Sequence, residues 1–279
     1  MPSRRHLLHN AIAATVGLAV GGQALPGPGS AVLPQADMEA LIKAAQIDPR
    51  RADTAITAGS KDSVLLVERA LRDRGLLAAT YVDGHFGTST VAAYAAYQRS
   101  LGYSGLDATG LPGQTSLRLL GEQRFTVTRA VTPGSAVAFR GAQVNIRTRA
   151  MLLEAERLLG RQLTISQGSY STSDPTSAGT HDGGGVLDLS VDGMSSTLRT
   201  TVVRQLRQVG FAAWLRTPSQ GNWPYHVHAV ALGDTDQSAP AQHQAGDYYL
   251  GLNGLANRGA DDGPAVTPKL TWEEYQRTL

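Results

Sequence analysis

The chain of 279 residues contains no cysteine. A protein without thiols forms no disulfides and has no cysteine nucleophile, which excludes the cysteine-dependent peptidases and transpeptidases. Lysine is also scarce: only Lys43, Lys61 and Lys269 are present, and none follows a serine by three positions. The Ser-x-x-Lys motif is therefore missing, and so is the Gly-x-Ser-x-Gly motif of serine hydrolases. These absences leave covalent catalysis poorly supported.

Positive and negative charges balance over most of the chain. Residues 1–36 hold two of the 25 basic residues and none of the 23 acidic ones, so the remainder carries 23 of each. A nucleic-acid interface requires a basic face, and this balance gives no sign of one. We predict no nucleic-acid partner. A hydrophobic content of 42% with 17% charged residues is that of an ordinary globular protein.

The first 36 residues have the composition of a targeting segment. S-R-R-H-L-L at 3–8 precedes an uncharged stretch over 11–25, and this arrangement resembles the twin-arginine export signal. We predict a signal peptide over 1–36 and a secreted protein of the cell wall. The apolar stretch is too short and too rich in glycine for a membrane span, so none is expected in the mature protein. The alternative is a flexible tail with a chance pair of arginines.

Residues 59–122 show the pattern of a small domain of three helices. Apolar residues at helical spacing predict helices near 63–75, 91–102 and 116–121, and the turns at 83–90 and 107–115 separate them. A linker with a short helix at 37–47 is expected over 37–58, and a second linker over 123–135. The loop residue His85 is expected to be exposed.

This stretch resembles the peptidoglycan-binding module of bacterial wall enzymes. The resemblance rests on V-L-L-V-E-R-A-L at 64–71, D-G-H-F-G-T-S-T at 83–90 and S-L-R-L-L-G at 116–121. It implies a domain that holds the protein on wall glycopeptide. Tyr94, Tyr97 and Tyr103 either line its groove or pack in its interior.

Residues 136–255 predict a second domain of α+β class with an antiparallel sheet, followed by a tail over 256–279. Helices are expected at 145–160 and 198–210, and strands at 162–170, 184–191, 211–216 and 225–232. Helices and strands do not alternate regularly, which favours an antiparallel sheet over a parallel one. The fold class is therefore multidomain, with a small all-α domain preceding an α+β domain.

A set of metal-binding side chains lies in this second domain. His226 and His228 are two positions apart in a predicted strand, so both point to the same face. One of these imidazoles can bind a metal while the other reaches the substrate. Asp188 lies in another predicted strand, and His181 precedes a run of three glycines that lets the backbone approach closely. Two imidazoles and one carboxylate are the ligand set of a catalytic zinc ion with one open position.

The order of these residues resembles that of the D-alanyl-D-alanine metallopeptidases and the related hedgehog-type zinc proteins. The matching segments are S-A-G-T-H-D-G-G-G at 177–185, V-L-D-L at 186–189 and H-V-H at 226–228. The resemblance implies that His181, Asp188 and His228 bind Zn²⁺. It gives His226 the role of the catalytic histidine.

The sequence also departs from these families. Their members carry an S-G-Y-R segment whose arginine binds the substrate carboxylate, and this chain has Q-G-S-Y at 167–170 instead. We predict that Gln167, Tyr170 and Trp223 contact the substrate. Arg147 and Arg216 either replace the missing arginine or are surface cations.

The resulting expectation is a monomeric zinc metallopeptidase that cuts an amide bond in peptidoglycan stem peptides, as a carboxypeptidase or an endopeptidase. The alternative is a non-catalytic wall-binding protein in which zinc is structural. A glycan-cleaving hydrolase is a third option without a supporting motif.

Overall fold

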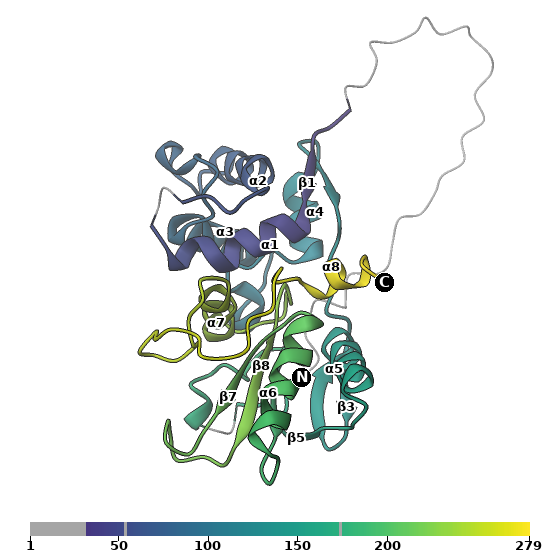
Figure 1. Cartoon of the computed structure of the whole chain (residues 1–279). Helices are drawn as coiled ribbons and strands as arrows, with labels where there is room; N and C mark the ends of the chain where they lie inside the picture. The colour runs from purple at the N-terminus through teal and green to yellow at the C-terminus, as the bar shows by residue number, and fades with distance from the viewer. Residues whose placement is uncertain (1–31, 53–54, 173–174) are drawn as a thin grey trace, which may run out of the picture.

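The helices expected from apolar periodicity form in the computed structural model, which describes residues 32–52, 55–172 and 175–279 (Figure 1). The chain combines helices with antiparallel strands. The first half contains α1 (Met38–Ile47), α2 (Lys61–Asp73), α3 (Thr88–Ser100) and α4 (Gln114–Gly121). Two short strands, β1 (Gln35–Asp37) and β2 (Thr126–Thr128), pair in parallel. We call residues 35–131 the helical region.

The core of the helical region extends beyond the predicted domain at 59–122. Met38, Leu41 and Ile42 of α1 are buried against α2, α3 and α4, and Phe125 and Val131 lie in the same cluster. Segments predicted as linkers therefore contribute core residues. Part of the predicted signal peptide, at Gln35 and Ala36, belongs to β1, while residues 1–31 lie outside the described part.

Two of the three tyrosines expected at a groove or in the interior lie in the interior, and the third, Tyr103, is half-buried. Tyr94 and Tyr97 are buried, and their rings meet edge to face with centroids 5.8 Å apart. His85 is also buried, at 5% exposure, contrary to the exposed position expected. The turn at 83–90 that carries His85 packs against the end of α1, where the Phe86 N–H donates to Asp48. His85 Nδ1 lies 2.7 Å from the Ala55 carbonyl oxygen.

Glu68 of α2 is a buried carboxyl that receives N–H groups of Asp83 and Gly84 and the Thr90 hydroxyl. Burial raises its pKa from 4.5 to about 7. The folded protein therefore binds a proton that the unfolded chain releases above pH 4.5. This contribution to stability is complete below that pH and is lost as the pH rises to about 7.

We expect Glu68→Gln to remove this pH dependence. Relative to the variant, the wild type should lose on the order of 2–3 kcal/mol of unfolding free energy between pH 5 and pH 8. Urea unfolding at both pH values measures this difference. Glu122→Gln, at an exposed position, is the control and should follow the wild type. Parallel pH profiles for wild type and Glu68→Gln would contradict the assignment.

The second half of the chain, residues 136–276, is built around a four-stranded antiparallel sheet and is called the sheet region. The sheet order is β5-β6-β8-β7, with β5 at Thr164–Gln167, β6 at Val186–Ser190, β7 at Phe211–Arg216 and β8 at His226–Ala231. A hairpin of β3 (Ala136–Phe139) and β4 (Ala142–Asn145) leads into α5 (Ile146–Leu159), which ends at Gly160 in the left-handed conformation. Helix α6 (Ser196–Gln208) precedes β7. This hairpin was not predicted, whereas the four strands and both helices were.

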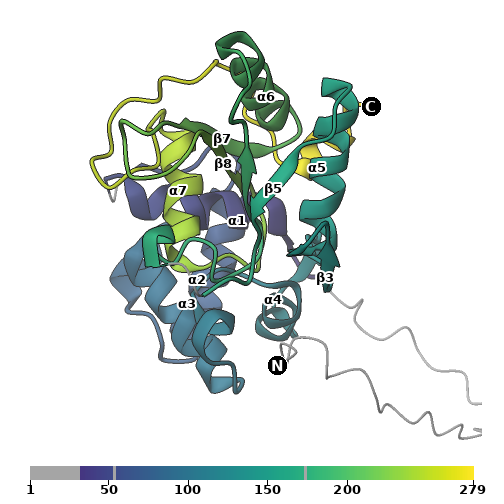
Figure 2. The same ribbon diagram turned by 90° about the horizontal axis from the view of Figure 1, so that it is seen from below.

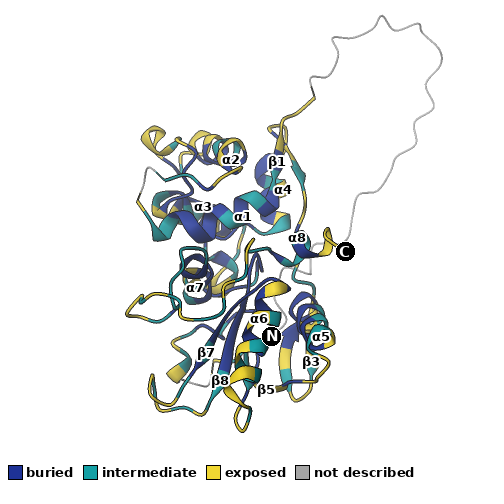
Figure 3. Ribbon diagram, in the orientation of Figure 1, coloured by how far each residue is buried: buried dark blue, intermediate teal, exposed yellow. Residues whose placement is uncertain are grey.

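Helices cover both faces of this sheet (Figure 2). Leu187, Leu189 and Val227 point to the face covered by α5 and α6. The intervening residues point to the other face, where Val186, Val230 and Trp214 contact α7 (Ala239–Tyr249). Strands β7 and β8 are buried along most of their length, as their dark blue colour in Figure 3 shows. Because successive side chains of a strand point to opposite faces of the sheet, every second side chain of β7 and β8 faces α7.

The helical and sheet regions meet along α1 and α7, which lie side by side in Figure 1. The two backbones approach so closely that a Cβ atom at Gly246 would lie 2.0 Å from the Gln46 carbonyl oxygen. Arg50 donates to both carboxylate oxygens of Asp247 at 3.1 Å, and Gln46 donates to Gln237. The two regions are thus joined by backbone contact and by paired side chains.

Residues 256–279, predicted as a tail, are fixed to the sheet region. Helix α8 (Trp272–Gln276) begins at Thr271 with reciprocal capping by Glu274. Glu273 accepts two hydrogen bonds from Arg147, which is buried and also donates to the Leu232 carbonyl. Arg147 is therefore not a surface cation, because its guanidinium ties α8 to α5.

Candidate metal centre

The sheet places its polar side chains on the face that α7 covers. Asp188 of β6 lies opposite His228 of β8, and His228 in turn lies opposite Trp214 of β7. His226 lies opposite Arg216 one pair further along. These side chains share a face because each is an even number of positions from the residues that contact α7. The prediction that His226 and His228 point to one face is confirmed.

His181 reaches the same face from the loop between β5 and β6. The three glycines after it pack closely against other segments of the protein. A Cβ atom at Gly183 would lie 2.3 Å from the Asp236 carbonyl oxygen, and one at Gly184 would lie 2.7 Å from the Tyr170 hydroxyl. Gly185 has a φ of +79°, which side chains rarely adopt. The backbone N–H of Ser171 donates to the His181 carbonyl. These contacts fix the loop so that the His181 ring faces Asp188.

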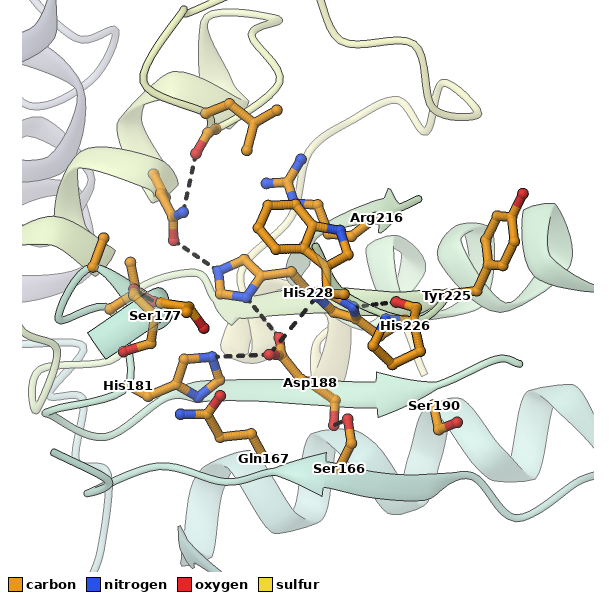
Figure 4. A pocket seen from close by; sticks show the side chains of 18 of the residues that line it. Ser166, Gln167, Ser177, His181, Asp188, Ser190, Arg216, Tyr225, His226 and His228 are labelled. Atoms are coloured by element: carbon orange, nitrogen blue, oxygen red, sulfur yellow. Dashed lines mark hydrogen bonds and ion pairs between the residues drawn. The ribbon is translucent and has the colours of Figure 1, made fainter. Parts of the chain in front are cut away.

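The three predicted ligands converge. His181 Nε2 lies 3.4 Å from Asp188 Oδ2, and His228 Nδ1 lies 2.8 Å from Asp188 Oδ1 (Figure 4). One ligand atom from each residue lies within 4.8 Å of the others. In the described part of the chain, no fourth histidine, aspartate or glutamate joins this group. The cluster could hold a metal ion.

Hydrogen bonds at the outer nitrogens orient both imidazoles. His181 Nδ1 lies 2.8 Å from the Gly168 carbonyl oxygen, which can only accept, so Nδ1 carries the proton and Nε2 offers a lone pair. His228 Nε2 lies 2.8 Å from Gln244 Oε1. The Gln244 amide is itself oriented, because its Nε2 donates to the Gly254 carbonyl at 3.0 Å. His228 Nδ1 therefore offers its lone pair towards Asp188.

This set of donors could hold a metal ion in place of a proton. Two lone pairs that face each other at 2.8 Å repel unless a proton or a metal ion shared by the two atoms offsets the repulsion. Burial lowers the pKa of His228, which disfavours its protonated form. Burial alone would raise the pKa of Asp188, but positive charge and donated hydrogen bonds at the facing His228 and His181 hold it below its usual value, and with neutral imidazoles a bound cation would supply that charge. Neutral imidazoles with an ionised carboxylate are the forms that bind metal.

His226 lies at the edge of this cluster. Its Nδ1 lies 2.9 Å from the Pro224 carbonyl oxygen and therefore carries a proton, while its Nε2 is 3.8 Å from Asp188 Oδ2. The ring is half-buried and meets Trp223 edge to face, with centroids 5.9 Å apart. His226 is thus placed beside the three donors without belonging to their group.

A cavity of about 430 Å³ opens over the cluster. Its lining includes His181, Asp188, His226 and His228 together with Gln167 and Trp223, both predicted to contact a substrate. Tyr170 is not among the lining residues. Its backbone has a φ of +57°, and its hydroxyl donates to Asp236 at 2.9 Å. The structure therefore brings Gln167 and Trp223 to the site but places Tyr170 under the glycine loop.

Two residues of the site were not identified by their spacing in the sequence. Gln244 lies on α7, a helix that the sequence analysis did not predict, and it fixes the orientation of His228. Arg216, weighed either as a replacement for the missing arginine or as a surface cation, is 4% exposed and lines the cavity, so it is not a surface cation. Its position at the end of β7, opposite His226, is a consequence of strand pairing that no local pattern records.

Gln244→Ala is expected to weaken metal binding by about 10- to 100-fold, because residues that orient a ligand have effects of that size. Without its partner, the His228 ring loses the acceptor that keeps the proton on Nε2. Competition with a chromophoric chelator measures the affinity for Zn²⁺. Gln276→Ala, an exposed glutamine of α8, is the matched control. Equal affinities in the two variants would show that Gln244 has no such role.

No family model, curated protein or solved structure matches this chain. Among the described residues, none of the helices combines the length and the apolar character needed to cross a membrane.

Proposed function

We propose that the chain is an exported zinc-dependent peptidase that hydrolyses an amide bond in peptidoglycan stem peptides. The observation that supports this most is the convergence of His181, Asp188 and His228 at the wall of a cavity. Nitrogen donors mixed with one carboxylate suit Zn²⁺. When bound by three protein ligands, zinc keeps a fourth position for water or substrate, lowers the pKa of that water to about 7 and polarises a carbonyl group.

The chain's own residues supply the remaining steps. Hydrolysis adds water across the amide bond: the oxygen joins the carbonyl carbon and a proton goes to the leaving nitrogen. His226 lines the cavity with Nε2 on the side of Asp188, so Nε2 can accept a proton and, once protonated, pass it on or donate a hydrogen bond to the developing oxyanion. Gln167 and Trp223 orient the peptide in the same cavity.

The helical region would hold the protein on the wall. This role rests on the resemblance of residues 64–121 to peptidoglycan-binding modules, with the wall then supplying substrate at high local concentration. Co-sedimentation of the protein with insoluble peptidoglycan tests this part separately from catalysis. Protein that stays in the supernatant at all wall concentrations would refute it.

The peptidase activity is tested by digesting purified peptidoglycan with the zinc-loaded protein. Mass spectrometry of the soluble products should show new amino or carboxyl termini in the stem peptides. Intact peptides with stoichiometric zinc would instead indicate a wall-binding protein with a structural metal. Cleaved glycan with intact peptides would point to a glycan hydrolase.

A further inference from the structure

The segment that follows α7 forms one wall of the cavity. We call residues 252–260 the cavity loop, which runs beside α7 (Figure 1). The residues of this loop that line the cavity are Gly254, Leu255 and Ala256. The loop closes on itself, because the Asn253 N–H donates to the Gly259 carbonyl at 2.8 Å. The position of the lining residues therefore depends on the contacts that hold the two ends of the loop.

Side chains of the metal centre hold the first end of the cavity loop. Three successive carbonyl oxygens accept one side-chain hydrogen bond each, and they belong to Leu252, Asn253 and Gly254. In that order the donors are Trp214 Nε1 at 3.1 Å, Arg216 Nη1 at 3.0 Å and Gln244 Nε2 at 3.0 Å. The Trp214 ring lies nearly parallel to the His228 imidazole, with ring centroids 6.4 Å apart. This end of the loop is thus fixed by side chains that surround a metal ligand.

The helical region holds the other end of the cavity loop through Arg258. Arg258 Nη2 donates to the Arg50 carbonyl at 3.2 Å and lies 3.2 Å from Asp247 Oδ1. The buried carboxylate of Asp247 also accepts two hydrogen bonds from the Arg50 side chain. One carboxylate of α7 is therefore shared by an arginine of the helical region and an arginine of the cavity loop.

The backbone of Arg258 supports a role for its side chain. Its φ is +47°, in the left-handed region that glycine adopts without a steric cost and other residues rarely adopt. Such a conformation persists where the surrounding contacts fix it. The Arg258 N–H donates to the Leu255 carbonyl at 2.9 Å. The place of Arg258 therefore determines that of Leu255 at the cavity wall.

We infer that Arg258 is a positioning residue through which the helical region fixes the cavity wall formed by Leu255 and Ala256. The inference rests on the proposed function, because it takes the cavity as the site that binds the peptide, and it goes further. The helical region then contributes to the binding of a peptide that is not attached to the wall. Without the Arg258 contacts the loop is in place for only part of the time, and the apparent affinity falls by that fraction.

Hydrogen exchange of the full-length, zinc-loaded protein tests this tie without any need for hydrolysis. The amides of Leu255 and Gly259 are hydrogen-bonded within the loop. In Arg258→Ala both should exchange about 3- to 10-fold faster than in the wild type, because an ion pair and a hydrogen bond no longer oppose local opening. Arg258→Lys keeps the charge beside Asp247 and should give intermediate rates. Unchanged exchange in Arg258→Ala would overturn the inference.

Arg157→Ala is the matched control for this experiment. Arg157 forms an ion pair with Glu154 within α5, on the opposite face of the sheet from α7. Its removal should leave the exchange of the cavity loop at the wild-type rate. Equally fast loop exchange in Arg157→Ala and Arg258→Ala would trace the effect to general destabilisation and would also overturn the inference.

Turnover of a soluble synthetic stem pentapeptide tests the effect on the cavity. In Arg258→Ala, KM should rise about 3- to 10-fold while kcat stays within about twofold, because the hydrogen bonds at 252–254 and the metal ligands remain. Zinc content, measured on the same samples, should equal that of the wild type. Faster loop exchange with an unchanged KM would overturn the inference. If the wild type hydrolyses no peptide, the proposed function fails, whereas the exchange rates still decide whether Arg258 fixes the loop.

Discussion

Replacing His181 with alanine is expected to abolish stoichiometric zinc binding. The free energy of zinc binding reaches about 10–16 kcal/mol over four ligands, so one ligand contributes roughly 3–4 kcal/mol and its loss weakens binding by about 100- to 1,000-fold. The remaining donors, Asp188 and His228, keep their positions because both lie on strands of the sheet. Metal analysis after dialysis against a weak chelator measures the retained zinc.

His243→Ala is the control for this measurement. His243 is an exposed histidine of α7, one position from Gln244, so its loss tests whether removal of any imidazole near the site lowers zinc content. The control should retain one zinc ion per chain. Stoichiometric zinc in His181→Ala would be incompatible with the assigned ligands. The same result in a properly folded Asp188→Ala variant would place the metal elsewhere.

Replacing His226 with alanine should lower the rate of peptide hydrolysis by about 10²- to 10⁴-fold, the usual contribution of a positioned acid–base group. Zinc content should not change, because His226 lies outside the group of three ligands. Turnover of a defined stem peptide, with zinc measured on the same samples, tests both statements. A loss of zinc in this variant would mean that His226 is itself a ligand.

His226→Gln separates the two roles open to this residue. A glutamine amide can donate a hydrogen bond to an oxyanion but cannot transfer a proton near neutral pH. Recovery of much of the rate in His226→Gln would assign hydrogen-bond donation, whereas rates equal to those of His226→Ala would assign proton transfer. Full wild-type activity in both variants would remove His226 from the mechanism.

Local patterns in the sequence predicted two imidazoles and one carboxylate as donors, while the choice of His228 over His226 came from the resemblance to known metallopeptidases. A side chain two positions from another on a strand shares its face, so His226 and His228 could be placed together before their neighbours were known. The convergence of Asp188 with them depends on the pairing of β6 with β8, which the sequence did not predict. The glycine run signalled the close approach of the His181 loop.

The features that the sequence did not predict, helix α7 and the surroundings of two arginines, depend on tertiary contacts. Helix α7 buries Ala241, Ala245 and Gly246, small residues that give a weak apolar signal but allow close packing. Because α7 was missed, Gln244 was missed as well. Arg147 and Arg216 look alike as isolated arginines, and only the fold shows that one meets Glu273 while the other lines the cavity.

The close contact of α1 with α7 has a mechanical consequence. Modules joined by a flexible tether sample many separations, whereas backbones in van der Waals contact at Gly246 admit one. If the helical region binds peptidoglycan as proposed, the cavity lies at a fixed distance from the bound segment of the wall. This distance, rather than the affinity for the peptide, would then decide which stem peptides the cavity can contact.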